Sequence, residues 1–267
     1  KADGGAINNR GSSATINDCE FISNKALKQN DINGLGGAIF MFQGTLNMDV
    51  DKTTITTFEG NHATNGGAIA QRAGTANINN ADFTSNQGQW NGGALYHKKA
   101  VNLTDCKFTS NTTESKGGAV CSEGGTLKAT NCTFTGNTSN DEGGAYRLAS
   151  SGTATLTGCT FTNNEAKNTG GGAIKFNTGT LTIDGCVFSG NTATKGDVNG
   201  HEIKLSTDPT SDTYYRPTIQ NSTFDPSKVR NLAGDSNAYI DGGNNKTPYL
   251  DEDQEGGNDE DEEIIIP

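Results

Sequence analysis

Aromatic and cationic side chains recur at one position of the chain, and they are the residues best suited to bind a ligand. Tyr96, Arg147 and Lys175 each follow the apolar residue after a Gly-Gly-Ala motif. In an extended chain, consecutive side chains point to opposite sides, so we expect this position to face outward. The file of outward residues is Phe40, Ala70, Tyr96, Cys121, Arg147, Lys175 and Lys204.

Exposed aromatic rings beside cations can stack on sugars or anchor a protein partner. Trp90 precedes one Gly-Gly-Ala motif, and a Tyr-Tyr-Arg triplet begins at residue 214. We expect the following residues to be exposed and to form the ligand-binding face: Trp90, Tyr96, Arg147, Lys175, Tyr214, Tyr215 and Arg216.

Groups suited to catalysis are sparse. Glycoside hydrolases use a pair of carboxyl groups, and other polysaccharide enzymes use carboxylates that hold Ca²⁺. Asp141 and Glu142 are adjacent, but no neighbouring repeat carries an acid at that place. The sequence Asn199-Gly200-His201 resembles a polygalacturonase signature, without the acidic motif that accompanies it. We therefore expect no enzyme activity, and polysaccharide binding or processing stays the alternative.

Five cysteines share one recurring position, two residues before a phenylalanine: Cys19, Cys106, Cys132, Cys159 and Cys186. Thr56, Ala81 and Ser222 take this position elsewhere, which indicates a small side chain that faces inward. Stacked strands would hold neighbouring Cβ atoms about 4.8 Å apart, slightly too far for a disulfide, so we expect free thiols. No Cys-x-x-Cys pair is present and the three histidines are scattered, so we predict no metal site and no cofactor.

Two short motifs alternate along the chain and define the repeat that positions these residues. Gly-Gly-Ala followed by an apolar residue begins at Gly4, Gly36, Gly66, Gly92, Gly117, Gly143 and Gly171. Phe-x-x-Asn begins at Phe21, Phe58, Phe83, Phe108, Phe134, Phe161 and Phe188. A period of roughly 25 to 30 residues is typical of a solenoid.

The segments between the motifs alternate apolar and polar residues with period two, as at 153–156 and 180–183, which predicts strands. Each repeat has room for three short strands and none for a helix. The sequence therefore predicts an all-β fold, a right-handed parallel β-helix over residues 1–250 with three strands per coil and about eight to nine coils.

Stacking of the coils predicts three interior files. The first contains Ile7, Ile39, Ile69, Leu95, Val120, Tyr146 and Ile174, and the second contains Met48, Ile78, Leu103, Ala129, Leu156 and Ile183. The phenylalanines of the second motif form the third file. The asparagines of that motif should form a ladder of amide hydrogen bonds at intervals of about 4.8 Å along the axis.

The formal charge of -11 is concentrated near the C-terminus, where residues 251–263 contain nine acidic side chains. This run predicts a solvated linker. Beyond it, Ile264, Ile265 and Ile266 favour a strand that either begins a next domain or pairs with another copy of the chain. Nucleic acid is not an expected partner, because it needs clustered Lys and Arg. No stretch approaches the roughly 18 apolar residues of a transmembrane segment.

The alternation of the two motifs from Gly4 to Asn191 resembles the repeat of the chlamydial polymorphic membrane proteins, and of related β-helical surface proteins in other microbes. The resemblance implies a passenger like that of an autotransporter, displayed outside the cell and engaged in adhesion. On this basis we expect a secreted, extracellular module at the cell surface with an adhesive or structural role. Its partner would be a protein or glycan on a host or neighbouring cell.

Sequons for N-glycosylation are also present. Asn102 should face solvent from a strand, and Asn221 begins a second candidate sequon. These two asparagines are the predicted glycosylation sites if the chain is made as a glycoprotein.

Overall fold

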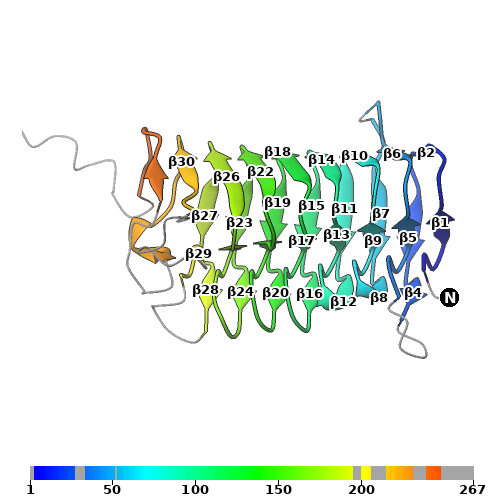
Figure 1. Ribbon diagram of the computed structural model, residues 1–267, viewed down its shortest axis with the longest axis horizontal. Coiled ribbons are helices and arrows are strands. Elements are labelled where there is room, and N and C mark those ends of the chain that lie inside the picture. The colour runs from blue at the N-terminus through cyan, green and yellow to red at the C-terminus, as the bar shows by residue number, and fades with distance from the viewer. Residues whose placement is uncertain are drawn as a thin grey trace, which may run out of the picture.

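The computed structural model describes residues 3–27, 34–51, 53–194, 200–205, 215–230 and 239–247. All strand ladders in these residues are parallel, and the chain winds into a rod of stacked coils (Figure 1). The described residues contain no α-helix and one 3-10 turn, η2 (Pro226–Lys228). The predicted all-β parallel β-helix is confirmed. The predicted acidic linker at 251–263 and the strand at Ile264–Ile266 lie outside the described residues.

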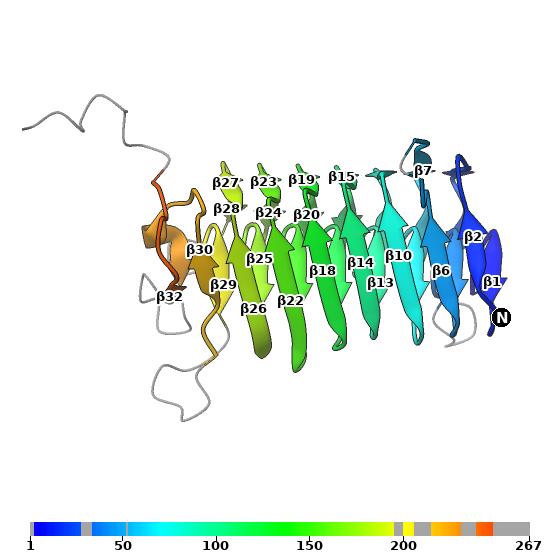
Figure 2. The same cartoon turned by 90° about the horizontal axis from the view of Figure 1, so that it is seen from above.

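The described strands form four sheets that run along the rod, two of nine strands and two of seven. Sheet A contains β1(Ile7–Asn9), β5(Ile39–Met41), β9(Ile69–Gln71), β13(Leu95–His97), β17(Val120–Ser122), β21(Tyr146–Leu148), β25(Ile174–Phe176), β29(Ile203–Leu205) and β31(Val229–Arg230). Sheet B, seen broadside in Figure 2, contains β2(Ala14–Ile16), β6(Thr45–Met48), β10(Thr75–Asn79), β14(Ala100–Thr104), β18(Thr126–Thr130), β22(Gly152–Thr157), β26(Gly179–Asp184), β30(Thr218–Gln220) and β32(Ile240–Asp241).

The other two sheets contain seven strands each among the described residues. Sheet C contains β3(Glu20–Ile22), β7(Thr56–Glu59), β11(Ala81–Thr84), β15(Lys107–Thr109), β19(Thr133–Thr135), β23(Thr160–Thr162) and β27(Val187–Ser189). Sheet D contains β4(Lys25–Ala26), β8(His62–Asn65), β12(Gln87–Asn91), β16(Thr112–Thr113), β20(Thr138–Ser139), β24(Glu165–Ala166) and β28(Thr192–Ala193).

The prediction of three strands per coil is wrong, because each full coil has four. The strand that the sequence did not reveal is that of sheet D, which directly follows the asparagine corner. It is only two residues long in β16, β20, β24 and β28, too short for alternation to show. Among the described residues, seven coils contain all four strands, and sheets A and B continue to nine strands, so the predicted eight to nine coils exceed the number of complete coils.

The three predicted interior files are confirmed by the strand register and by burial. Ile69, Leu95 and Val120 pair in sheet A and are 0% exposed, as are Ile78 and Leu156 in sheet B. The phenylalanine rings from Phe21 to Phe188 stack in one column, with neighbouring centroids 4.7–4.9 Å apart and planes within 6° of parallel. Each coil thus covers the apolar residues of the next, which lets a chain with few hydrophobic residues bury a core.

The asparagine ladder is also confirmed. The Asn111 side-chain amide donates to Asn137 Oδ1 at 3.0 Å and to the Phe83 carbonyl at 2.9 Å, and the Asn111 backbone N–H donates to the same Oδ1 at 3.0 Å. The pattern repeats in each coil up to Asn191, whose amide donates to Glu202 Oε2 at 3.0 Å. The ladder therefore satisfies polar groups that would otherwise be buried without partners.

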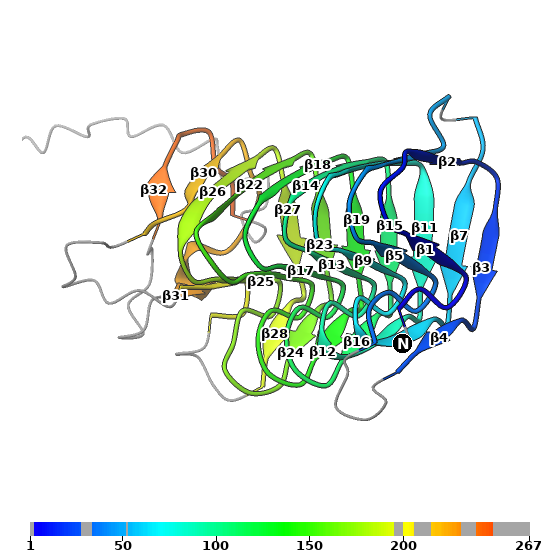
Figure 3. The same cartoon turned by 45° about the vertical axis from the view of Figure 1, so that its right-hand side comes forward.

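Both glycines of the Gly-Gly-Ala motif are required by the backbone. Gly117 has φ of +70°, in the left-handed region where a side chain is strained. A Cβ on Gly118 would lie 1.9 Å from the carbonyl oxygen of Gly144 in the next coil. The chain passes through this narrow neck between sheet D and sheet A, so that the sheet D strands form a smaller lobe beside the main one (Figure 3).

Candidate functional site

The outward file of sheet A is the candidate site, and its residues pair in register from coil to coil. Tyr96 pairs with Cys121, Cys121 with Arg147, and Arg147 with Lys175. The side chains nevertheless are buried: Tyr96 is 5% exposed, Arg147 8%, Lys175 3% and Lys204 5%. The prediction that Tyr96, Arg147 and Lys175 lie exposed on the surface is therefore wrong.

The file is buried because the residue before each Gly-Gly-Ala motif folds over it. These residues form a ladder of parallel bridges of their own, which we call the covering ladder: Leu35, Asn65, Asn91, Lys116, Glu142 and Gly170. The first glycine of the motif turns the chain against the strand that follows, so that a Cβ on Gly143 would lie 3.3 Å from Arg147 Cβ. The outward file is thus enclosed between sheet A and the covering ladder.

The N-terminal half of the file is mostly apolar. Phe40, Ala70, Tyr96 and Cys121 form a second buried cluster, against which Leu35 packs. The Tyr96 hydroxyl donates to Glu123 Oε2 at 2.5 Å, and Lys98 Nζ lies 3.3 Å from the same oxygen. Burial and the Glu123 carboxylate raise the pKa of Tyr96 above its ordinary value, so this hydroxyl stays protonated. In this half of the file the apolar side chains pack together and the Tyr96 hydroxyl has a hydrogen-bond partner, so its role is structural.

The C-terminal half of the file is cationic. The Arg147 Nε donates to Glu142 Oε2 at 2.5 Å, and Lys116 Nζ lies 3.9 Å from that oxygen. Lys175 and Lys204 follow Arg147 in register. Burial and the neighbouring Lys204 and Arg147 lower the pKa of Lys175 to about 8, against the effect of Glu142. The file therefore places positive charge in a poorly solvated position.

The other predicted ligand-binding residues do not join this file. Trp90 lies in β12 and is 45% exposed, as expected. Tyr215 is half-buried against the main core, and Arg216 is exposed and donates to the Tyr239 carbonyl. Tyr214 lies outside the described residues. Among the described members of the predicted set, Tyr96, Arg147 and Lys175 share one file, and Trp90, Tyr215 and Arg216 lie outside it.

The two predicted glycosylation sites lie on sheet B and just beyond β30. The Asn102 side chain is half-buried, and its amide donates to Asn77 Oδ1 at 2.8 Å. Asn221 is exposed, and its amide donates to Asp184 Oδ1 at 2.7 Å. A glycan would replace one of the two hydrogens on the side-chain nitrogen, so the remaining N–H would have to make the hydrogen bond that each amide makes here.

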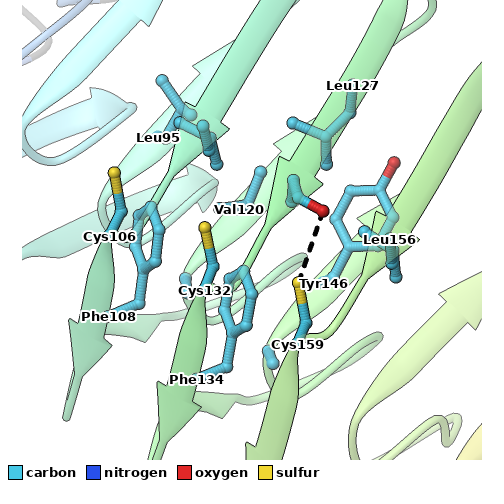
Figure 4. Close-up of a cluster of buried hydrophobic side chains, with 14 of the residues drawn as sticks. Leu95, Cys106, Phe108, Val120, Leu127, Cys132, Phe134, Tyr146, Leu156 and Cys159 are labelled. Atoms are coloured by element: carbon cyan, nitrogen blue, oxygen red, sulfur yellow. Dashed lines mark hydrogen bonds between the residues drawn. The ribbon is translucent and has the colours of Figure 1, made fainter. Parts of the chain in front are cut away.

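The six cysteines are free thiols in the structure. Four of them, Cys106, Cys132, Cys159 and Cys186, are buried in consecutive coils beside the phenylalanine stack, and Figure 4 shows the first three pointing the same way. Each thiol donates to a carbonyl two residues earlier, for example from Cys106 to Thr104 at 3.3 Å. Ser222 Oγ makes the same bond to Gln220 at 2.6 Å, which explains why serine replaces cysteine here.

The structure also contains a buried histidine network that could not be predicted from the sequence, because no sequence motif marks it. His97 Nδ1 lies 2.9 Å from the Lys99 carbonyl, so this nitrogen carries the proton and donates. The Ser122 hydroxyl therefore donates to His97 Nε2 at 2.5 Å and accepts from the Tyr146 hydroxyl at 2.9 Å. Burial lowers the pKa of His97 to about 4. The serine–histidine pair resembles a nucleophile and its base, but both residues are fully buried, so we interpret it as structural.

No three His, Cys, Asp or Glu side chains in the described ranges gather closely enough to hold a metal ion. None of the described residues belongs to a helix with the length and hydropathy of a membrane span.

Comparison with known families gives one result. The Chlamydia polymorphic membrane protein repeat matches residues 55–71 and 105–123, which confirms the resemblance expected from the two motifs. Each matched segment covers the same part of a coil, from sheet C through sheet D and the glycine neck to sheet A. No curated protein and no solved structure is significantly similar to the chain.

Proposed function

We propose that the chain is an extracellular β-helix module at a cell surface, with an adhesive or structural role and no catalysis. The observation that carries the proposal is the match to the polymorphic membrane protein repeat. The matched segments contain the features that build the coil: the phenylalanine stack, the asparagine ladder and the glycine neck. Because the matching repeat builds this rod, we infer that the chain shares the surface role of the proteins that carry the repeat.

The regularity of the rod supports a role in display. Seven coils repeat the same four strands, and buried ladders of Phe and Asn join each coil to the next. Solenoids of this kind present a long surface built from equivalent positions. We infer that the partner is a protein or glycan on a host or neighbouring cell.

Polysaccharide binding or processing is the second candidate. The cationic half of the outward file favours binding, because it places Arg147, Lys175 and Lys204 in one line. Processing gains less support: Glu142 already pairs with Arg147 and Lys116, and Asp141 accepts a hydrogen bond from Thr169 at 2.9 Å. Polysaccharide binding is therefore better supported than polysaccharide processing.

The proposal is tested by coating fluorescent beads with the intact chain and counting the beads that attach to cultured cells. We expect saturable attachment that soluble chain competes away, and none with beads coated with the heat-denatured chain. The same preparation is incubated with a panel of neutral and uronate polysaccharides. Absence of saturable attachment would contradict the adhesive role, and release of reducing ends or unsaturated sugars would contradict the absence of catalysis.

A further inference from the structure

Four cations lie in register on the outer side of sheet A. Arg147 pairs with Lys175, Lys175 with Lys204, and Lys204 with Arg230. Neighbouring strands in a sheet are about 4.8 Å apart, and like charges directly opposite one another are destabilising. The line of cations therefore requires a compensating negative charge.

At Arg147 the covering ladder provides that charge. Glu142 lies in this ladder, and its Oε2 is 2.5 Å from Arg147 Nε and 3.9 Å from Lys116 Nζ. The next residue of the ladder, bridged to Glu142 one coil later, is Gly170. Among the residues that the structure describes, Gly170 therefore leaves the place beside Lys175 that corresponds to the Glu142 carboxylate without a side chain.

Lys175 makes no direct polar contact with the described residues, although Glu142 and Asp141 act on its charge from a distance. Its side chain is 3% exposed, and it makes no hydrogen bond or ion pair with any residue that the structure describes. The fully enclosed side-chain atoms that lack a hydrogen bond in the described ranges are His62 Nε2, Gln71 Oε1 and Ser139 Oγ. The Lys175 nitrogen is not one of them, so the stem of the side chain is buried while its charged tip still reaches the surface.

We propose that Lys175 is an oxyanion-binding site, at which a carboxylate or sulfate group of an acidic polysaccharide takes the place that Glu142 fills beside Arg147. The inference rests on the proposed binding function and names its ligand class. A polymer suits the site better than a small anion, because Arg147, Lys204 and Arg230 continue the line of positive charge along the axis on both sides of Lys175, and this charge attracts an extended polyanion.

The charged groups that face Lys175 predict how binding depends on pH. They are Arg147 on β21, Lys204 on β29, and Asp141 and Glu142 before β21. Burial lowers the pKa of Lys175 to about 8, whereas an exposed lysine keeps a value of about 10.4. The affinity for a polyanion should therefore fall as the pH rises through about 8, a range in which exposed lysines do not titrate.

The test measures the affinity of the intact chain for polygalacturonate, which carries only carboxylates, for dextran sulfate, which carries only sulfates, and for neutral dextran. We expect binding to at least one charged polymer and none to dextran. Lys175→Met should lower that affinity about tenfold, equivalent to about 1.4 kcal/mol. The polymer that loses affinity identifies the group that the site recognises. Lys128→Met, which removes an exposed lysine from sheet B, is the matched control and should have little effect.

Two further variants separate binding from folding. Lys175→Met keeps a buried side chain of similar length and removes a poorly solvated charge that makes no ion pair with any described residue, so its melting temperature should equal or exceed that of the wild type. Glu142→Gln frees Arg147 and Lys116 and should raise the affinity. The proposal is overturned if the wild type binds neither charged polymer, or if Lys175→Met binds as tightly as the wild type or as Lys128→Met. Bead attachment to cells could persist in each of those cases, so failure of this site would leave the adhesive role standing.

Discussion

Replacement of Glu202 by Gln should make the protein more stable above neutral pH. Glu202 is 1% exposed and ends the asparagine ladder, where its Oε2 accepts the Asn191 amide at 3.0 Å. Burial raises the pKa of Glu202 from 4.5 to about 7, although Asn191 and Lys228 favour its charged form. A glutamine side chain can accept the same hydrogen bond through its own oxygen without carrying a charge.

The sign and size of the effect follow from the raised pKa. Between pH 4.5 and 7 the folded protein keeps a proton on Glu202 that the unfolded chain has lost, so the stability from this group is present below pH 4.5 and is lost as the pH rises through 7. Each pKa unit corresponds to about 1.4 kcal/mol, so the loss is about 3 kcal/mol at most. Glu202→Gln should match the wild type near pH 4 and exceed it by up to about 3 kcal/mol at pH 8.

The assay is urea unfolding of both proteins at several pH values. The free energy of unfolding of the wild type is subtracted from that of Glu202→Gln at each pH, so that the contributions of all other carboxylates cancel. Glu59→Gln, at an exposed position at the end of β7, is the control and should give a flat difference. If Glu202→Gln is less stable than the wild type at pH 8 and its stability depends on pH in the same way, the claim that burial raises the pKa of Glu202 at the end of the asparagine ladder is refuted.

Three other predictions concern the coil itself. Phe134→Ala should cost about 3 to 5 kcal/mol, because it opens a cavity between rings stacked 4.9 and 4.7 Å away, and an unchanged urea midpoint would show that the stack is not interior. Gly118→Ala should cost more than about 3 kcal/mol, because its Cβ would meet the Gly144 carbonyl. Gly136→Ala is the control: the nearest contact of its Cβ would be 3.7 Å away, so it should cost only about 1 to 2 kcal/mol, from its positive φ. Thiol titration of the unfolded, unreduced chain should find most of the six cysteines free, and recovery of two or fewer would establish bridging.

The interior of the rod could be predicted from the sequence because each interior residue carries its own signal. Leu95 and Phe108 are apolar and recur at fixed places, so stacking of the repeats places them correctly. The same holds for Asn111, since an amide ladder needs the same residue in every coil. These features depend on residue type alone.

The covered outer file could not be predicted in the same way. The residues that cover it, such as Asn91, Lys116 and Glu142, are polar and differ from coil to coil. They cover sheet A because the positive φ of the following glycine turns the backbone, not because they are apolar. A pattern based on side-chain hydrophobicity therefore assigned Arg147 and Lys175 to an exposed surface.

The proposed binding site depends on the covering of Lys175 by the fold, and titration of the Lys175 side chain tests that covering most directly. The measurement is a pH titration of the side-chain nitrogen by heteronuclear NMR on the intact chain, with the signal assigned by its loss in Lys175→Met. The structure predicts a pKa of about 8 for this ammonium. A pKa near 10.4, the value of an exposed lysine, would contradict the account, because the outward file of sheet A would then be solvated and water would already stabilise the charge of Lys175.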